Sequence, residues 1–520
     1  MNGLANRAPR GYSGRMDQAR RPLLAAALGL AASRFVPAAA AQGVAQGTGQ
    51  GATAEARLAA RLARLAEDGL DPAWYGIPDP ALVFADPAGN RAALQRAAGL
   101  ALADLLGGRL RDVPGRPDIR RDPSLDLARW QAELATAAEP AAVIDRAALL
   151  PPEAAALKAE LARAMRLAAR GWATIPGEST LDPGSTDPVR VPALRARLAA
   201  EDPQLAAAPD RGALYDPALE AAVRRWQQAQ GLEVDGRVGR LSLRELNQPP
   251  SRRVDQLRVA LDMRRAALAE GTGRRIEVNI PDYRLSVLED GQELLGMAVI
   301  VGRRDRQTPM LRVRMTAIQL NPPWGVPERN AREDLLPQLR RNPQEVAERG
   351  FRIFQTVAGE RVEIDPRTVD WSQYHARRFP FIIRQDAGET NALGLIKFIM
   401  PNGDDIFMHD TPDRHLFRRP DRAFSSGCIR LAQPAELMAL LLEGTPGWTA
   451  ERAQGVIDSR QTEVVALRRP LPVLLRYRTV TVEAGGRVRI RPDIYDLDTG
   501  YARAMAAPPR QVLARLEGGR

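Results

Sequence analysis

The chain has 520 residues, of which 45% are hydrophobic and only 5% aromatic, and it contains a single cysteine. This composition is sufficient for several globular domains with aliphatic cores, and one cysteine excludes a fold held by internal disulfides. The formal net charge is +11, but basic and acidic residues are interleaved without a basic block, so we expect no nucleic-acid partner. The positive charge is almost entirely arginine, because lysine occurs only at Lys158 and Lys397.

Residues 1–41 have the pattern of a secretory signal peptide. Adjacent arginines precede an apolar run over 23–32, and small residues lead to a cleavage site near Ala41. The apolar run is too short to span a bilayer, so we expect export with cleavage; an uncleaved N-terminal anchor is the alternative. Residues 42–55 are small and polar and predict a flexible linker.

Helical patterns dominate the next part of the chain. Leucines at helical spacing predict an all-α domain over 56–180, without a catalytic constellation. Pro, Gly, Ser, Thr and Asp over 176–188 predict a loop and a domain boundary. A short three-helix unit is expected over 188–248, with Asp216 and Pro217 at the start of its middle helix. A connecting helix should follow over 252–270.

From residue 274 the hydrophobic pattern becomes alternating, which predicts a β-rich domain over 274–445. The long insertion over 321–390 has helical patterns and aromatic residues. A C-terminal extension over 446–505 contributes strands that complete the scaffold or the β-rich unit. Strands are expected over 276–280, 284–288, 294–301, 313–319, 395–398, 404–409, 471–477, 480–482 and 488–491, with a helix over 434–442.

Cys428 is the most informative residue of the β-rich domain. It follows Ser425-Ser426-Gly427, and His409 stands at the end of the preceding predicted strand. An unpaired cysteine is usually a small buried hydrophobe. Here, however, His409 can act as a base and Arg430 can favour the thiolate. We therefore interpret Cys428 as a nucleophile and His409 as the general base and acid of acyl transfer.

Supporting roles are assigned to residues around this pair. The Gly427 and Cys428 amides, with Ser426, are candidates for holding an oxyanion. Arg430 either positions a substrate carboxylate or holds the loop. His375 and His415 are alternative bases, but lone histidines in polar loops are generally solvated, and His415 lies among arginines. Ser425 is a further candidate for substrate binding. Asn391 and Trp324 are candidates for lining the cleft, and each is equally consistent with a turn or core role.

His409 followed by Ser-Ser-Gly-Cys-Ile-Arg resembles the catalytic signature of the L,D-transpeptidases, in their large multidomain periplasmic branch with a YkuD-type catalytic domain. Shorter members usually carry His where this chain has Ser426. The partner that orients His409 is therefore open between a backbone carbonyl and the Asp410 side chain. The unit over 188–248 is similar to peptidoglycan-binding domains, and the insertion over 321–390 is similar to the lid subdomain of the large branch.

The resemblance implies an α+β multidomain protein with an all-α scaffold, a small peptidoglycan-binding domain, and a β-rich catalytic domain with a lid. It implies a periplasmic enzyme that joins donor and acceptor stem peptides of peptidoglycan by 3→3 cross-links, through a Cys428 thioester and with release of D-alanine. Carbapenem-type β-lactams are implied inhibitors. No cofactor is implied, and no metal-ligand spacing occurs. The alternatives are an L,D-carboxypeptidase or endopeptidase that passes the acyl group to water, and a non-catalytic wall-binding protein.

Overall fold

The computed structural model describes residues 53–111, 113 and 115–507. The predicted signal peptide and most of the predicted linker lie outside these residues. The last residues of the expected linker are already ordered, because Thr53 accepts a hydrogen bond from the Ala56 N–H and caps a helix that begins at Ala54.

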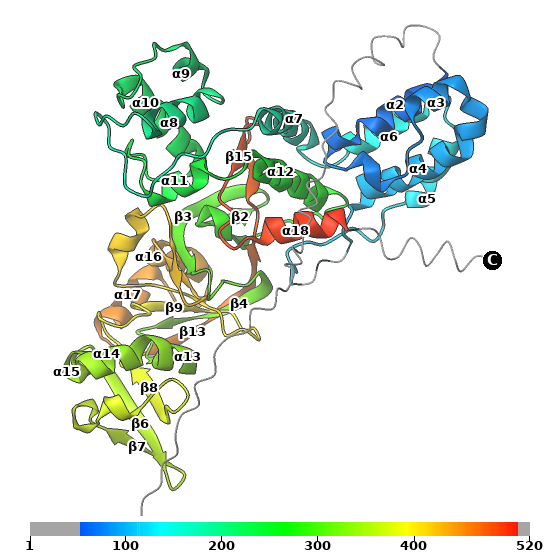
Figure 1. Cartoon of the computed structure of the whole chain (residues 1–520). Helices are drawn as coiled ribbons and strands as arrows, with labels where there is room; N and C mark the ends of the chain where they lie inside the picture. The colour runs from blue at the N-terminus through cyan, green and yellow to red at the C-terminus, as the bar shows by residue number, and fades with distance from the viewer. Residues whose placement is uncertain (1–52, 112, 114, 508–520) are drawn as a thin grey trace, which may run out of the picture.

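The N-terminal helices form a compact bundle with a core of leucine and alanine (Figure 1). The leucines that predicted these helices, such as Leu58, Leu62 and Leu102, are buried in this core. Gly69 adopts a left-handed conformation with φ 80° and ends the first helical segment. The helices are α2 (Ala54–Ala63), α3 (Pro80–Ala85), α4 (Pro87–Gly107), α5 (Leu127–Thr136) and α6 (Pro140–Leu149), with 3-10 turns at Leu65–Asp68 and Pro72–Trp74.

A second helical layer joins the N-terminal and C-terminal parts of the chain. Helix α7 (Ala154–Arg170) packs against α12 (Pro250–Arg264), together with the hairpin β14 (Val480–Val482) and β15 (Val488–Ile490). Helix α18 (Leu497–Ala506) also packs on α12. The expected connecting helix is thus a core element, and it ends six residues before the predicted boundary at 270, shortly before Ala266 takes a positive φ of 45°.

The unit predicted over 188–248 has its own core around Leu219, Val223 and Trp226. Asp216 caps the middle helix by accepting a hydrogen bond from the Leu219 N–H, as the sequence predicts. The structure adds a short helix, α9, to the three that were expected. The helices are α8 (Arg190–Ala199), α9 (Pro203–Ala207), α10 (Pro217–Gln230) and α11 (Arg240–Leu246).

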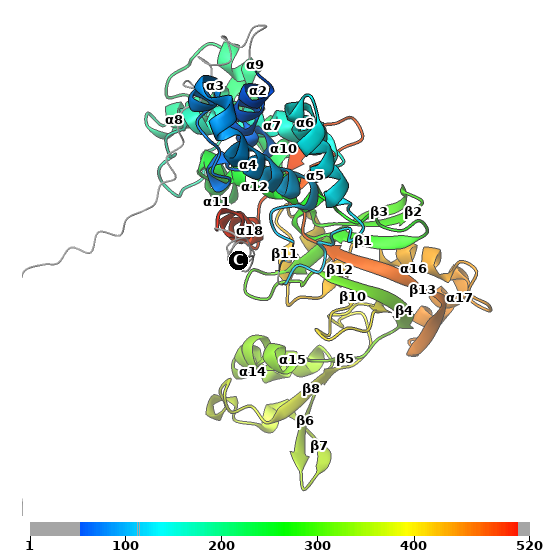
Figure 2. The same cartoon turned by 90° about the vertical axis from the view of Figure 1, so that its right-hand side faces the viewer.

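The largest sheet in the described residues has nine strands, in the order β11-β3-β12-β10-β9-β4-β13-β1-β2, and a further pairing joins β2 to β3. Helices α16 (Pro434–Leu442) and α17 (Ala450–Asp458) contribute to its core (Figure 2). The strands are β1 (Arg275–Asn279), β2 (Arg284–Glu289), β3 (Gln292–Gly302), β4 (Leu311–Leu320), β9 (Ile396–Ile399), β10 (Met408–His409), β11 (Ala423–Ser425), β12 (Ile429–Leu431) and β13 (Glu463–Arg476).

Two predicted strands have different lengths in the structure. The strand expected over 404–409 is reduced to β10, because the Asn402 side chain bonds to Met400 O, Ile406 O and the Asp404 and Ile406 N–H groups and folds this segment into a turn. β13 begins at Glu463, earlier than the predicted 471, and pairs with β4 on both sides of an irregularity between Ala466 and Leu471.

The insertion predicted over 321–390 forms a separate subdomain, here called the inserted subdomain (324–385). It has a four-stranded sheet in the order β5-β8-β6-β7 and its own aromatic-rich core. In both views it lies at the opposite end of the molecule from the helical domains (Figures 1 and 2). Its elements are β5 (Trp324–Gly325), α13 (Glu328–Asn330), a π-helical turn (Ala331–Leu335), α14 (Leu336–Arg341), α15 (Pro343–Glu348), β6 (Phe351–Val357), β7 (Glu360–Ile364) and β8 (Phe381–Gln385).

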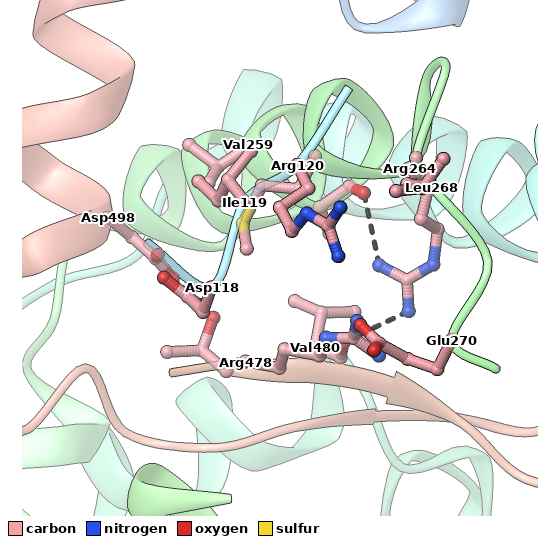
Figure 3. A pocket seen from close by; sticks show the side chains of 14 residues that line it. Asp118, Ile119, Arg120, Val259, Arg264, Leu268, Glu270, Arg478, Val480 and Asp498 are labelled. Atoms are coloured by element: carbon pink, nitrogen blue, oxygen red, sulfur yellow. Dashed lines mark hydrogen bonds between the residues drawn. The ribbon is translucent and has the colours of Figure 1, made fainter. Parts of the chain in front are cut away.

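A cavity of about 50 Å³ lies between α12, the segment 118–120 and the start of β14 (Figure 3). Arg120, Arg264 and Arg478 are among its lining residues, and none of the lining residues is a predicted site residue. Among the helices that the structure describes, none combines the length and apolarity required to cross a membrane.

Candidate active site

The sheet brings the two predicted reactive residues onto neighbouring strands. β10 and β12 run parallel, with Met408 opposite Ile429 and His409 opposite Arg430. Continuing this register places Cys428, which immediately precedes β12, beside Phe407. Because side chains alternate along a strand, Cys428 lies on the same face as His409, whereas Met408 and Ile429 point into the core, where both are fully buried. The burial of Met408 and Ile429 thus determines that His409 and Cys428 lie together on the opposite face.

The His409 ring is held by the backbone of the residue that follows it. Its side chain is buried, and Nδ1 lies 2.5 Å from the Asp410 carbonyl oxygen. A carbonyl only accepts, so Nδ1 carries the proton and Nε2 of the neutral ring carries the basic lone pair. The Asp410 carboxylate is occupied by the Thr411 and Leu395 N–H groups and by Arg414. Of the two orienting partners left open by the sequence, the backbone carbonyl is therefore confirmed.

The environment of His409 favours the neutral imidazole. Burial lowers the pKa of His409 to about 3, and the positive charges of Arg430 and Lys397 act in the same direction. The backbone of Asp410 and Leu393 opposes this shift. His409 is therefore unprotonated at neutral pH, which is the state that a general base requires before it accepts a proton.

The Cys428 thiol is partly exposed, and Sγ lies 3.8 Å from the Asp405 carbonyl oxygen. Burial raises the pKa of this thiol, while the Phe407 N–H, Lys397 and Arg430 act against that rise. The resting state is therefore a protonated thiol on the same face of the sheet as a neutral imidazole. Such a pair needs transfer of the thiol proton to the base as the sulfur attacks.

Ser425 shapes the loop before Cys428. Its hydroxyl donates to the Cys428 carbonyl oxygen at 2.5 Å and accepts from the Gly427 N–H at 3.1 Å. The Gly427 N–H is thus already engaged, so an oxyanion would compete with the Ser425 hydroxyl for this donor. The Gly427 carbonyl accepts from Thr308 Oγ1 at 2.7 Å. Ser425 is buried and acts on loop geometry, not as a lining of the cleft.

Ser426 points away from this loop and contacts the inserted subdomain. Its hydroxyl accepts hydrogen bonds from Arg306 at 2.8 Å and from Asn330 at 3.0 Å. The Arg306 side chain is only 3% exposed and also pairs with Glu333 at 2.5 Å and Asp334 at 2.6 Å. This network links the turn after β3, the loop before Cys428 and the first helical turns of the inserted subdomain.

The remaining predicted site residues have structural surroundings. Arg430 pairs with Asp413 at 2.9 Å and reaches His409 only through its charge. The Asn391 side chain is fully buried and bonds to backbone groups, including Asp386 O at 2.8 Å and the Leu393 N–H at 2.7 Å. Trp324 packs against Phe351 in the core of the inserted subdomain. The hypothesis that Asn391 and Trp324 line the cleft is therefore corrected to turn and core roles.

Lys397 is a site residue that the sequence analysis missed. It lies on β9 directly opposite His409. The available signal was its rarity, since lysine occurs only twice in an arginine-rich chain. His375 and His415, in contrast, are both exposed and lie outside the catalytic sheet's strands. Within the described ranges, no group of three or more His, Cys, Asp or Glu side chains is arranged to hold a metal ion.

Two protein families match parts of this chain. Residues 273–448 match the L,D-transpeptidase catalytic domain (YkuD), and residues 189–246 match the family described as "Putative peptidoglycan binding domain". A Haemophilus influenzae protein described as "Putative L,D-transpeptidase" is 38% identical over 241 residues, which are 46% of this chain and 48% of that relative. The match thus spans about half the length of the curated relative.

Solved structures of the same kind are more distant. An L,D-transpeptidase from Mycobacterium smegmatis is 13% identical with a TM-score of 0.19, covering 40% of this chain and 59% of its own. An L,D-transpeptidase from Stackebrandtia nassauensis is 12% identical with a TM-score of 0.20, covering 58% of this chain and 97% of its own. From the family matches we conclude that residues 273–448, which hold Cys428 and His409, are an L,D-transpeptidase catalytic domain, and that a peptidoglycan-binding domain precedes it.

Proposed function

We propose that this protein is a periplasmic peptidoglycan L,D-transpeptidase that forms 3→3 cross-links through a thioester on Cys428. The observation that carries the proposal is the parallel register of β10 and β12, which brings the single thiol of the chain onto the same face of the sheet as a buried, neutral histidine. This pair lies inside the matched catalytic domain.

In the proposed acylation, Cys428 Sγ attacks the carbonyl carbon of the third residue of the donor stem. The thiol proton moves to His409 Nε2 as the C–S bond forms. The amide C–N bond then breaks, His409 returns the proton to the departing nitrogen, and D-alanine leaves. The Cys428 and Ser426 amides are the candidates for stabilising the oxyanion, because the Gly427 amide is engaged by Ser425.

In the proposed second step, the amine of an acceptor stem attacks the thioester. His409 takes a proton from that amine, the C–S bond breaks, and the proton returns to sulfur. Water competes with the amine for the same intermediate. We propose that the inserted subdomain acts as a lid that limits this competition, since its Asn330 already contacts Ser426 beside the nucleophile.

We further propose that the domain over 189–246 holds the wall polymer near the catalytic cleft. The family match supports this role, while the fold alone does not determine a ligand. Removing residues 188–248 as a unit should weaken sedimentation of the protein with isolated sacculi and leave reaction with small soluble donors largely intact.

Product analysis with purified tetrapeptide stems tests the proposal. A cross-linked dimer with release of D-alanine is expected from the full chain and not from Cys428→Ala. A trimmed tripeptide as the main product would favour the carboxypeptidase alternative. An unchanged substrate from a folded protein would favour a non-catalytic wall-binding role.

Carbapenem acylation provides a second test that needs no peptidoglycan. A β-lactam ring opened by Cys428 Sγ leaves a stable adduct, so intact mass should increase by one drug molecule. The increase should disappear in Cys428→Ala and slow strongly in His409→Gln, because the base is removed. An equal adduct on Cys428→Ala would show that another residue is the nucleophile.

A further inference from the structure

Lys397 occupies the same face of the sheet as the reactive pair. It is the β9 residue opposite His409, and cross-strand partners in an antiparallel pair project to one side. Its Nζ lies 3.9 Å from the centroid of the Phe407 ring, and Phe407 is the residue that the β10–β12 register sets beside Cys428. The ammonium is thus held over an aromatic ring next to the sulfur.

The charge of Lys397 is not neutralised by a contact. Among the described residues, Lys397 has no carboxylate oxygen within the 4.0 Å of an ion pair, whereas Arg430 is paired with Asp413 at 2.9 Å. Asp405 is the acid that acts on Lys397, through its charge alone. The charged groups that act on Cys428 are Lys397 from β9, Asp405 from the loop before β10 and Arg430 from β12, and His409 lies on the same face of the sheet.

We propose that the Lys397 ammonium stabilises the negative charge that develops on the Cys428 sulfur and adds to the burial that keeps His409 neutral. This inference rests on the proposed function, because it assigns Lys397 to the same acyl-transfer step. One positive charge favours the thiolate and disfavours the imidazolium, so it assists the nucleophile and leaves the imidazole unprotonated before the attack. The pKa of Lys397 is lowered by burial, and the charges of Cys428 and Asp405 oppose that change.

A compact ammonium suits this position. The chain uses arginine for nearly every other cation, yet a guanidinium is a planar fork that seeks paired acceptors. Lysine presents a point charge at the end of a flexible stem, which can lie over Phe407 without a carboxylate partner. Lys397→Arg should therefore keep most of the electrostatic effect, whereas Lys397→Met should remove it.

Alkylation of the single cysteine measures this effect directly. Iodoacetamide reacts with the thiolate, and intact mass reports Cys428 alone because the chain has one cysteine. We expect the alkylation profile of Lys397→Met to shift to higher pH, with a rate at pH 7.5 about three- to tenfold below that of the unmodified protein. Arg487→Met, which removes the same charge from an exposed side chain in the hairpin β14–β15, should leave the profile unchanged.

An unchanged alkylation profile in a folded Lys397→Met protein would overturn the proposal. If circular dichroism shows that the Lys397→Met protein is unfolded, the same measurement is made on Lys397→Gln. A higher KM for the stem peptide with an unchanged thiol profile would also overturn it, by assigning Lys397 to substrate binding. Because alkylation requires no peptide, a shifted profile in a protein without cross-linking activity would contradict the proposed function and retain the role of Lys397.

Discussion

At the scale of single residues, the protonation state of His409 has a measurable consequence for stability. Its pKa falls from the ordinary 6.5 to about 3 on folding, so between these values the unfolded chain binds a proton that the folded chain does not. The contribution of His409 to the free energy of unfolding is therefore fully present above about pH 6.5 and is lost as the pH falls toward 3. At pH 5 the loss is about 2 kcal/mol.

Urea unfolding at pH 7 and pH 5 tests this prediction. The unmodified protein should lose about 2 kcal/mol more than His409→Gln over this interval, because glutamine does not titrate. Equal losses in the two proteins would indicate that the folded state protonates His409 as readily as the unfolded state does.

Gly427 is a second residue with a specific requirement. Its φ of 118° is strained for residues with a side chain, and an added Cβ would lie 3.1 Å from Ile406 Cδ1. Gly427→Ala should shift the Cys428 loop and slow carbapenem acylation about tenfold or more, at a stability cost of about 1–3 kcal/mol. Gly403→Ala is the matched control, since no atom lies within 4 Å of its added Cβ. Acylation at the normal rate would exclude a role for this loop conformation.

The pairing of Cys428 and His409 could be anticipated at this scale because both belong to short motifs of recognisable chemistry. The occupation of the Gly427 N–H could not, since it depends on the rotamer of Ser425. The roles of Asn391 and Trp324 were also missed. Both are polar or aromatic residues near loops, and only tertiary packing shows that one is buried in a turn and the other in a separate core.

At the scale of elements, Arg306 connects the inserted subdomain to the catalytic loop. Its guanidinium is buried between Ser426, Glu333 and Asp334, so its removal breaks the link between the catalytic loop and these two acids, which then keep only Arg329 and Arg303 as partners. Arg306→Met should lower the second-order rate of carbapenem acylation about tenfold, equivalent to about 1.4 kcal/mol. Arg304→Met, at a half-exposed side chain whose closest acid is Asp496 at 3.7 Å, is the control. Similar rates in both variants would contradict the coupling.

Strand prediction succeeded where alternation was uninterrupted, as in β1 and β2. It failed where side chains compete with the ladder. Asn402 replaces four residues of the expected strand 404–409 by a turn, and its hydrogen bonds cannot be read from periodicity. The early start of β13 was hidden by Arg468, Arg469 and Pro470, which interrupt the apolar pattern while an irregular register lets the strand continue.

At the scale of the whole molecule, Asp262 of α12 joins distant parts of the chain. Its buried carboxylate accepts from the Arg109 N–H at 2.5 Å, from Arg121 at 3.1 Å and from the Tyr501 hydroxyl at 2.7 Å. Asp262→Ala should lower the free energy of unfolding by about 3–5 kcal/mol in urea, because a buried guanidinium loses its partner. Asp255→Ala, on the same helix but 41% exposed, should change it by no more than about 0.5 kcal/mol.

The order of domains was predictable because the hydrophobic period changes along the chain. The packing of the C-terminal segment against α7 and α12 was only partly predictable. The sequence shows strands near 480 and 488 but not that they cover a helix more than 200 residues earlier, since contacts of such long range leave no local pattern.

Strand β13 lies between β4 and β1, although it follows Cys428 in the chain. A ribosome adds residues from the N-terminus onward. A nascent chain that ends just after Cys428 therefore lacks β13, a strand in the middle of the sheet. The nine-stranded sheet that carries the reactive centre can be completed only after residue 476 has been added. Prematurely terminated products should therefore be inert toward substrate, even though they contain both Cys428 and His409.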